Sequence, residues 1–201
     1  MTDQQSLAPR PAAADQNIEV IYPLTPMQEG MLYHAVEASQ SGVYFQQATL
    51  RLSGALDVDA LRRAWESVLA HHSALRSVFV WERLERPLQV VRKTAPLPWQ
   101  VLDWRDVAEA ERDARLAEFR HLDREAGFPL SKAPLMRLAL IRLANDDHRL
   151  VWSHHHLLLD GWSTAIVLRE VFETYAALVA GQTPDLPPAR PFRDYVTWLE
   201  Q

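Results

Sequence analysis

Three histidines stand together at positions 154–156, and an aspartate follows four residues after the last of them. Imidazole takes up and releases a proton near neutral pH, so this cluster suits acid–base chemistry on a substrate. Because neighbouring residues on a strand point to opposite faces, His155 and His156 cannot both face one site. We therefore expect one imidazole to be held on the core side and the other to face a cavity.

The acid in this segment, Asp160, follows three leucines and precedes Gly161. An apolar surround makes a carboxylate costly unless it is paired, and arginine is its natural bidentate partner. Arg76 lies among apolar neighbours and needs an anion, so the sequence predicts a buried Arg76–Asp160 ion pair. A simple turn or helix-capping role for Asp160 is the alternative. Gly161 is expected to adopt a backbone conformation that other residues resist.

The overall composition limits the classes of protein that these residues serve. The 201 residues include 21 Lys and Arg against 26 Asp and Glu, a net charge of −5, and 48% are hydrophobic. An acidic balance argues against nucleic-acid binding, and no apolar run is long enough to cross a membrane. The chain has no cysteine, and no third ligand accompanies His156 and Asp160, so no metal site is predicted. A cytoplasmic protein is the default expectation.

The elements that must position these residues alternate between strand and helix, which predicts an α/β layered domain. Residues 1–17 lack periodicity and are interpreted as a flexible leader or linker. The expected strands cover residues 44–52, 75–81, 87–92, 99–102, 135–143 and 149–153. The expected helices cover residues 26–38, 57–72, 106–125 (one helix or a pair), 163–181 and 192–199.

Three segments resemble motifs of the condensation domains of nonribosomal peptide synthetases. The HHLLLDGWS run at 155–163 resembles the family's HHxxxDG active-site motif. The YPLTPMQEGML run at 22–32 resembles its opening motif, and the HHSALRSVF run at 71–79 resembles the second motif, which contains Arg76. The order and spacing of the three make the resemblance specific, and it extends over residues 18–201.

The resemblance implies a chloramphenicol-acetyltransferase-like two-layer sandwich, with a mixed, mostly antiparallel sheet and flanking helices. It implies that residues 18–201 are the N-terminal lobe of a two-lobed domain whose C-terminal lobe is absent. The isolated lobe is then expected to be inactive. Its partners would be upstream donor and downstream acceptor carrier proteins, an adjacent adenylation domain and the missing lobe.

The resemblance also implies a reaction, in which the amine of an acceptor aminoacyl thioester attacks a donor acyl or peptidyl thioester. Both substrates are carried on phosphopantetheine, so no cofactor is bound directly. By motif position, His156 is the catalytic histidine and His155 is more structural. Asp160 and Arg76 shape the site, and the backbone at Gly161 approaches the thioester.

Several alternatives stay open at this stage. Three roles are open for His156: it accepts a proton, it orients the amine, or it stabilises the tetrahedral intermediate. Two other functions are open for the chain as a whole: a non-catalytic carrier-docking lobe, and a free-standing acyltransferase that uses coenzyme A. The basic residues are candidates for contacts with acidic carriers, although scattered arginines are more often plain solvated surface. These residues are Arg62, Arg63, Arg83, Arg86, Arg92 and Lys93.

Overall fold

The computed structural model describes residues 15–37 and 42–201. Most of the predicted leader, residues 1–14, lies outside the described residues. Asn17 is tied to Thr94 by two hydrogen bonds of 3.0 Å, one from the Asn17 side-chain amide and one from the Thr94 backbone amide. The end of the expected leader, at Asn17, therefore has defined contacts with the segment after β4.

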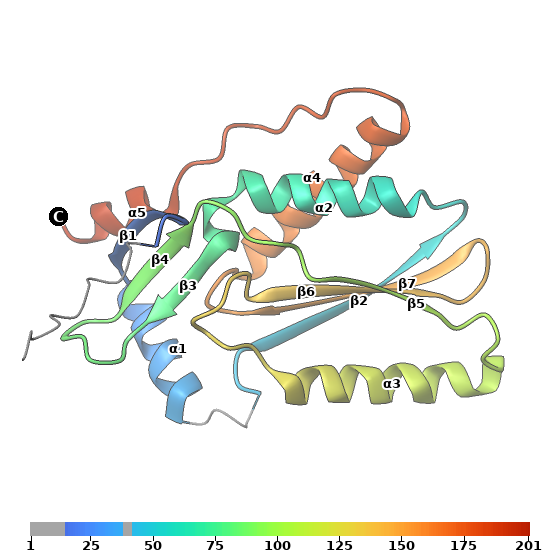
Figure 1. Cartoon of the computed structure of the whole chain (residues 1–201), viewed down its shortest axis with the longest axis horizontal. Helices are drawn as coiled ribbons and strands as arrows, with labels where there is room; N and C mark the ends of the chain where they lie inside the picture. The colour runs from blue at the N-terminus through green and yellow to red at the C-terminus, as the bar shows by residue number, and fades with distance from the viewer. Residues whose placement is uncertain (1–14, 38–41) are drawn as a thin grey trace, which may run out of the picture.

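From residue 26 onward strands and helices follow one another as the sequence predicts, whereas the first strand, at residues 18–23, is not among the expected elements (Figure 1). The strands are β1 (Ile18–Pro23), β2 (Phe45–Ser53), β3 (Ser77–Val80), β4 (Leu88–Arg92), β5 (Trp99–Asp103), β6 (Met136–Arg142) and β7 (Asp147–His155). The helices are α1 (Pro26–Glu37), α2 (Val58–His71), the short 3-10 turn η1 (Ser73–Arg76), α3 (Glu109–Ala126), α4 (Gly161–Val179) and α5 (Phe192–Leu199). Residues 106–125 give a single helix, and the strand expected from residue 75 begins only after η1.

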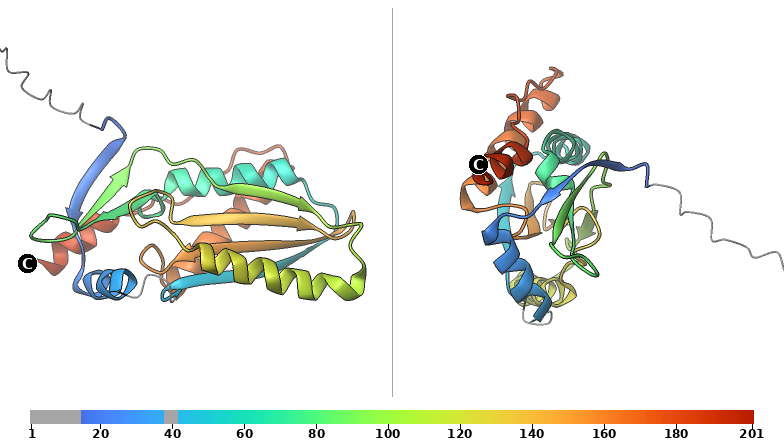
Figure 2. Two further views of the ribbon diagram at one scale, coloured as in Figure 1. Left: turned by 60° about the horizontal axis from the view of Figure 1, so that its bottom comes forward. Right: turned by 90° about the vertical axis from the view of Figure 1, so that its left-hand side faces the viewer.

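The strands form two sheets. The larger has the order β2-β7-β6-β5 and the smaller β1-β4-β3. Only the β5–β6 pair is parallel among the described strands, and the other four pairs are antiparallel. The prediction of an α/β fold with mixed, mostly antiparallel strands is confirmed. The small sheet lies at one end of the large sheet, with α5 beside β1 (Figures 1 and 2).

Helices lie against both faces of the large sheet (Figure 2). Leu138, Leu140 and Trp152 point toward α2 and α4, whereas Ala139 and Val151 point toward α3. This alternation is the period of two expected of strands buried on both faces. Helix α3 thus adds a further layer over the second face.

Helix α2 shows how the sequence fixes the main core. Asp57 caps it by accepting a hydrogen bond from the Ala60 backbone amide at 2.9 Å. One face then buries Leu61, Trp65 and Val68 completely, which contributes about 1.5–3 kcal/mol for each large side chain. The Trp65 ring meets Trp152 of β7 edge-on, with centroids 4.9 Å apart. Strand β7 is therefore packed against α2 at Trp152, three residues before the strand ends at His155.

Among the described residues, no helix combines the length and the apolar character that crossing a membrane requires.

Candidate functional site

A cavity of about 540 Å³ opens between α1, η1, the loop that follows β7 and the start of α4. Residues 189–192, ahead of and at the start of α5, line part of its wall. The cavity brings together three of the predicted site residues: His156, Asp160 and Arg76. His155 and Gly161 are not among its described lining residues. Figure 1 shows the junction of the two sheets at which these elements meet.

The three adjacent histidines occupy three different environments. His154 is buried and its ring lies against Trp152, with centroids 4.7 Å apart. His155 is buried and faces a separate cavity beside Phe45 and Phe128. Burial lowers the pKa of His154 and of His155 to about 4, so both rings are neutral at neutral pH. The expectation that His155 and His156 face opposite sides is confirmed, and of these three adjacent histidines only His156 lines the cavity at α4.

The His156 ring is fixed through one of its two nitrogens. Its Nδ1 lies 2.7 Å from the backbone carbonyl oxygen of Leu159. A carbonyl only accepts, so Nδ1 carries the hydrogen and the neutral ring keeps its lone pair on Nε2. Within the described residues, Nε2 has no hydrogen-bond partner. The half-buried ring therefore offers an uncommitted basic nitrogen.

Asp160 caps helix α4. Its Oδ1 accepts the Ser163 backbone amide at 2.8 Å, and its carbonyl oxygen accepts the Thr164 backbone amide at 2.9 Å. The hydrogen bond from the Ser163 amide holds the pKa of Asp160 below its ordinary value, and the Ser163 hydroxyl and nearby His156 add to this. The side chain is exposed. The capping alternative is the one that the structure supports.

The predicted Arg76–Asp160 ion pair is wrong. Arg76 is buried, but its Nη1 donates to Glu19 Oε2 at 2.9 Å and to the Arg92 carbonyl at 2.7 Å. Arg76 ends η1 and extends toward β1 and β4, while the Asp160 carboxylate serves the amides of α4. Asp160 finds its partner three residues ahead, whereas Arg76 reaches Glu19 across β4, so the two share a cavity wall without pairing.

The expectation for Gly161 also needs correction. Gly161 is the first residue of α4 and does not have a positive φ. A Cβ placed there would meet no atom within 4 Å. The glycine is therefore not required by the fold, and its backbone borders open space beside Asp160.

A hydrogen-bonded acid–histidine pair lies at the cavity and is not predicted by the sequence analysis. His72 Nε2 is 2.5 Å from Oε2 of Glu170, a residue of α4 that is only 2% exposed. Glu170 falls between Val167 and Val171 on the buried face of the helix. An acid at a core position of an amphipathic helix is the available signal, because such a carboxylate must have a partner.

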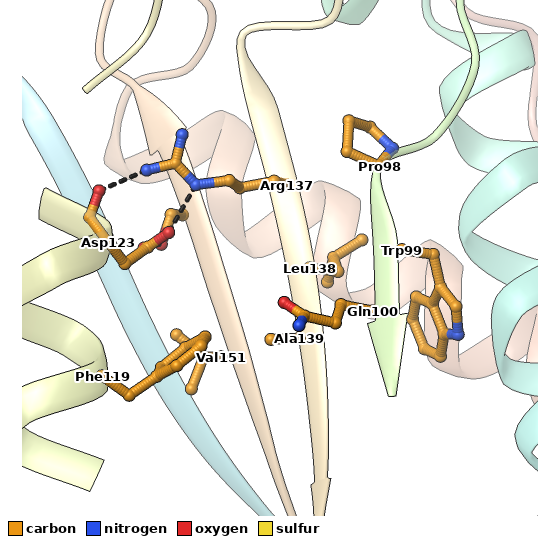
Figure 3. Close-up of a pocket in the computed structure, with 10 residues that line it drawn as sticks. Pro98, Trp99, Gln100, Phe119, Asp123, Arg137, Leu138, Ala139 and Val151 are labelled. Carbon is orange, nitrogen blue, oxygen red and sulfur yellow. Dashed lines mark hydrogen bonds and ion pairs between the residues drawn. The ribbon is translucent and has the colours of Figure 1, made fainter. Parts of the chain in front are cut away.

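A second cavity, of about 240 Å³, lies on the α3 side of the large sheet (Figure 3). Its charged groups are paired with each other. Asp123 accepts hydrogen bonds from Arg137, from Ser153 Oγ at 2.5 Å and from Gln47 Nε2 at 2.7 Å. Arg137 also donates to the Gly127 carbonyl at 2.6 Å and lies over the Phe128 ring. These groups fasten α3 to the sheet.

Comparison with known proteins places this chain in a family. The family model "Condensation domain" matches residues 18–201. The chain is 46% identical over 181 residues to a linear gramicidin synthase of Brevibacillus parabrevis, and 37% identical over 184 residues to bacitracin synthase 1 of Bacillus licheniformis. These alignments cover 90% and 92% of the chain but 2% and 4% of the relatives. The chain belongs to the condensation domain family.

Solved structures give the same fold. The starter condensation domain of the rhizomide synthetase RzmA superposes with a TM-score of 0.81 at 21% identity. The first condensation domain of the calcium-dependent antibiotic synthetase, solved with a substrate analogue, superposes with a TM-score of 0.80 at 23% identity. The matches cover 91% and 92% of this chain and 45% of each solved chain. The chain therefore spans less than half the length of these solved domains, and it shares the expected chloramphenicol-acetyltransferase-like fold.

Proposed function

We propose that this chain supplies the histidine-bearing lobe of a site for peptide-bond formation in nonribosomal peptide synthesis. In the proposed reaction, the amine of an aminoacyl thioester attacks an acyl or peptidyl thioester. Both substrates are delivered on the phosphopantetheine arms of carrier proteins, so the chain itself binds no resident cofactor. The isolated lobe is inactive in this proposal, because the rest of the domain is needed to enclose the substrates.

The observation that supports the proposal is the state of His156. Its Nδ1 is engaged by the Leu159 carbonyl at 2.7 Å, and its ring lines a cavity of about 540 Å³. A fixed imidazole with an uncommitted Nε2 is suited to receive a proton from an attacking amine. His155 and His154 are less suited to that task, because burial lowers the pKa of each to about 4.

The proposed step balances without an added reagent. The acceptor nitrogen attacks the thioester carbon, the C–N bond forms and the C–S bond breaks. His156 Nε2 takes the proton that the nitrogen loses and passes it to the departing sulfur, which leaves as a thiol. If His156 orients the amine instead, it does so with the same lone pair on Nε2. Stabilising the oxyanion needs an N–H at Nε2, which the ring offers only after it has taken the proton.

The remaining predicted residues take supporting roles in this proposal. Asp160 fixes the start of α4 by capping it. Gly161 leaves open space in which a thioester can approach the backbone. Arg76 holds η1 against Glu19 of β1, at the wall of the cavity.

The proposal that basic residues contact the carrier proteins is less specific. Three of the candidate basic residues already have acidic neighbours: Arg62 lies 3.8 Å from Glu66, Arg86 lies 3.9 Å from Glu29, and Arg92 pairs with Asp15. This pairing favours ordinary solvated surface at these three positions over a dedicated carrier site. Upstream and downstream carrier proteins and an adenylation domain are the partners that the proposed reaction requires.

The test uses this chain joined to the second half of a condensation domain, with donor- and acceptor-loaded carriers. Intact mass of the acceptor carrier reports peptide transfer. We expect transfer by the wild type and its loss in His156→Ala. The matched control is His121→Ala, which removes an exposed histidine of α3 that lies 3.4 Å from Glu125. Equal transfer by wild type and His156→Ala contradicts the site assignment. No transfer by a folded, correctly loaded wild type favours the carrier-docking alternative.

A further inference from the structure

A chain of buried amide side chains runs from the small sheet to the loop that carries His156. Gln28 of α1 is 7% exposed and Gln89 of β4 is 2% exposed. Gln28 Nε2 donates to Gln89 Oε1 at 2.9 Å and to the Leu157 carbonyl at 3.4 Å. Leu157 directly follows His156, so these contacts join three separate parts of the sequence beneath the cavity.

The orientation of Gln28 is fixed by the start of its own helix. The Thr25 backbone amide donates to Gln28 Oε1 at 3.1 Å, and the Gln28 backbone amide donates to Thr25 Oγ1 at 3.2 Å. This reciprocal arrangement is a capping box. Because Oε1 is used in the cap, Nε2 must point away from the helix, toward Gln89 and Leu157.

Gln89 fixes the other end of the chain of amides. Its Nε2 donates to Tyr22 Oη and to Ser77 Oγ, both at 2.8 Å. Burial raises the pKa of Tyr22 to about 12, so the phenol stays neutral. With both amide hydrogens committed, Gln89 presents its Oε1 to Gln28.

These amides line the cavity but have no donor left for a substrate. A side-chain amide has two hydrogens, and those of Gln28 and of Gln89 are all engaged within the protein. A substrate-binding role is therefore disfavoured. A buried amide is costly unless it is satisfied, and a fully satisfied network fixes one arrangement of the groups around it.

The group fixed by this network is the turn that orients His156. The His156 backbone amide donates to the Tyr44 carbonyl at 2.8 Å, and its Nδ1 reaches the Leu159 carbonyl three residues ahead. The contact from Gln28 to the Leu157 carbonyl lies between these two anchors. His155 also holds this turn, because its carbonyl accepts the Leu158 amide at 3.0 Å and its Nδ1 accepts the Leu157 amide at 3.2 Å, and the Gln28 contact adds a tie to α1.

We propose that Gln28 is a positioning residue for His156, and that Gln89 holds the Gln28 amide in the required orientation. Gln28 acts on the carbonyl of Leu157, and through the turn it keeps the hydrogen on Nδ1 and the lone pair on Nε2. The consequence for peptide transfer rests on the proposed function. The effect on the ring itself does not.

The experiment compares Gln28→Met, which keeps the length of the side chain but has no amide, with wild type. Nitrogen-15 NMR of the histidine rings in the 201-residue chain, assigned with His156→Ala, reports which ring nitrogen is protonated. We expect the neutral wild-type ring to carry its hydrogen on Nδ1 alone, and the variant to show a mixture of both tautomers. In the completed domain, we expect transfer to fall about tenfold, which corresponds to about 1.4 kcal/mol in the barrier.

Two further variants separate positioning from a merely structural role. Gln28→Met/Gln89→Leu removes both amides, so neither glutamine is left buried without the other, and the mixed tautomers persist. If Gln28→Met alone fails to fold, the NMR measurement is made on the double variant instead. Gln47→Met is the matched control, because Gln47 donates to Asp123 on the α3 side of the sheet and leaves the His156 signals unchanged.

Wild-type His156 signals in a destabilised Gln28→Met, or their return in the double variant, would overturn the proposal. Mixed tautomers together with a wild type that transfers no peptide would keep the positioning role and reject the proposed function. The ring spectrum therefore tests the positioning role, and the transfer assay tests the proposed function, independently of each other.

Discussion

The two cavities on either side of the large sheet differ in how their polar groups are used. On the α3 side, Asp123 is surrounded by Arg137, Ser153 and Gln47, and the network fastens a helix to the sheet (Figure 3). On the α4 side, His156 is held by one nitrogen and presents the other to the cavity. Charge and burial are present in both, but within the part of the chain that the structure describes the second cavity presents an uncommitted imidazole nitrogen, whereas the acid of the first is fully engaged.

A candidate active site is therefore recognised by hydrogen-bonding groups that have no partner within the protein. A network in which every polar group has a partner stabilises the fold, and the protein loses stability when one member is removed. A group with a free lone pair contributes little to stability and can act on a substrate. Substitutions on the two sides should therefore separate stability from transfer.

The largest effect is expected for His156→Ala. General acid–base groups contribute about 10²–10⁴-fold, so transfer in the completed domain should fall by that factor. Because the ring is half-buried and bonded by one nitrogen, the free energy of unfolding should change by no more than about 1 kcal/mol. Mass analysis of the acceptor carrier and urea denaturation measure the two quantities. A large loss of stability with normal transfer would mean that His156 stabilises the fold and does not act in the reaction.

Asp123→Ala should show the opposite behaviour. It leaves Arg137 without its acidic partner, and removal of one member of a buried ion pair costs about 3–5 kcal/mol. The partial exposure of Arg137 places the expected loss at the lower end, about 3 kcal/mol. Urea denaturation reports the loss, and transfer per folded molecule should stay at the wild-type value. A stability change below about 1 kcal/mol would mean that the Asp123 network does not stabilise the packing of α3 on the sheet.

The buried histidines predict a dependence of stability on pH. Burial lowers the pKa of His155 from its ordinary 6.5 to about 4, so between these values the unfolded chain binds a proton that the folded chain does not. Stability is full above about pH 6.5 and falls as the pH drops toward about 4, by up to about 3 kcal/mol from this residue. His155→Gln should flatten the profile over this window, while exposed His121→Gln should not. Parallel profiles for wild type and His155→Gln would contradict the burial argument.

A smaller change is expected for Asp160→Ala. Loss of an N-cap costs about 1 kcal/mol, and Asp160→Asn should retain most of the cap. Thermal or urea denaturation of the three proteins measures this. A loss above about 3 kcal/mol would revive the buried ion pair with Arg76 that the structure does not contain.

The smallest effect on folding is expected for Gly161→Ala. The added Cβ meets no atom within 4 Å at the first residue of α4, so stability should stay within about 1 kcal/mol of wild type. If the thioester approaches this backbone as proposed, transfer nevertheless falls. Denaturation and the transfer assay are measured on the same preparation. Unchanged transfer removes Gly161 from the site.

The sequence predicts the elements well where local rules decide them. Asp57 is followed by a regular apolar stripe, and the strands that flank residues 145–147 are short and apolar. Each of these patterns depends on neighbours only a few residues away. Strand alternation predicts opposed directions for His155 and His156, and the two side chains do line different cavities, although β7 ends at His155 and His156 begins the turn.

Pairings between distant residues are harder to predict. The sequence pairs Arg76 with Asp160 because both need a partner, but Glu19 is reached across β4 and the sequence does not say which acid is nearer. The His72–Glu170 pair joins residues 98 positions apart. Charge partners depend on how elements pack, whereas capping and periodicity do not.

The uncommitted Nε2 of His156 is tested most directly by diethyl pyrocarbonate, which acylates unprotonated imidazole nitrogens. The folded 201-residue chain is treated near neutral pH, and peptide mass mapping follows modification at each histidine, with exposed His121 as the internal standard. The account predicts that His156 is modified while buried His154 and His155 remain unmodified until the chain unfolds. Modification of His154 or His155 ahead of His156 in the folded chain would contradict it.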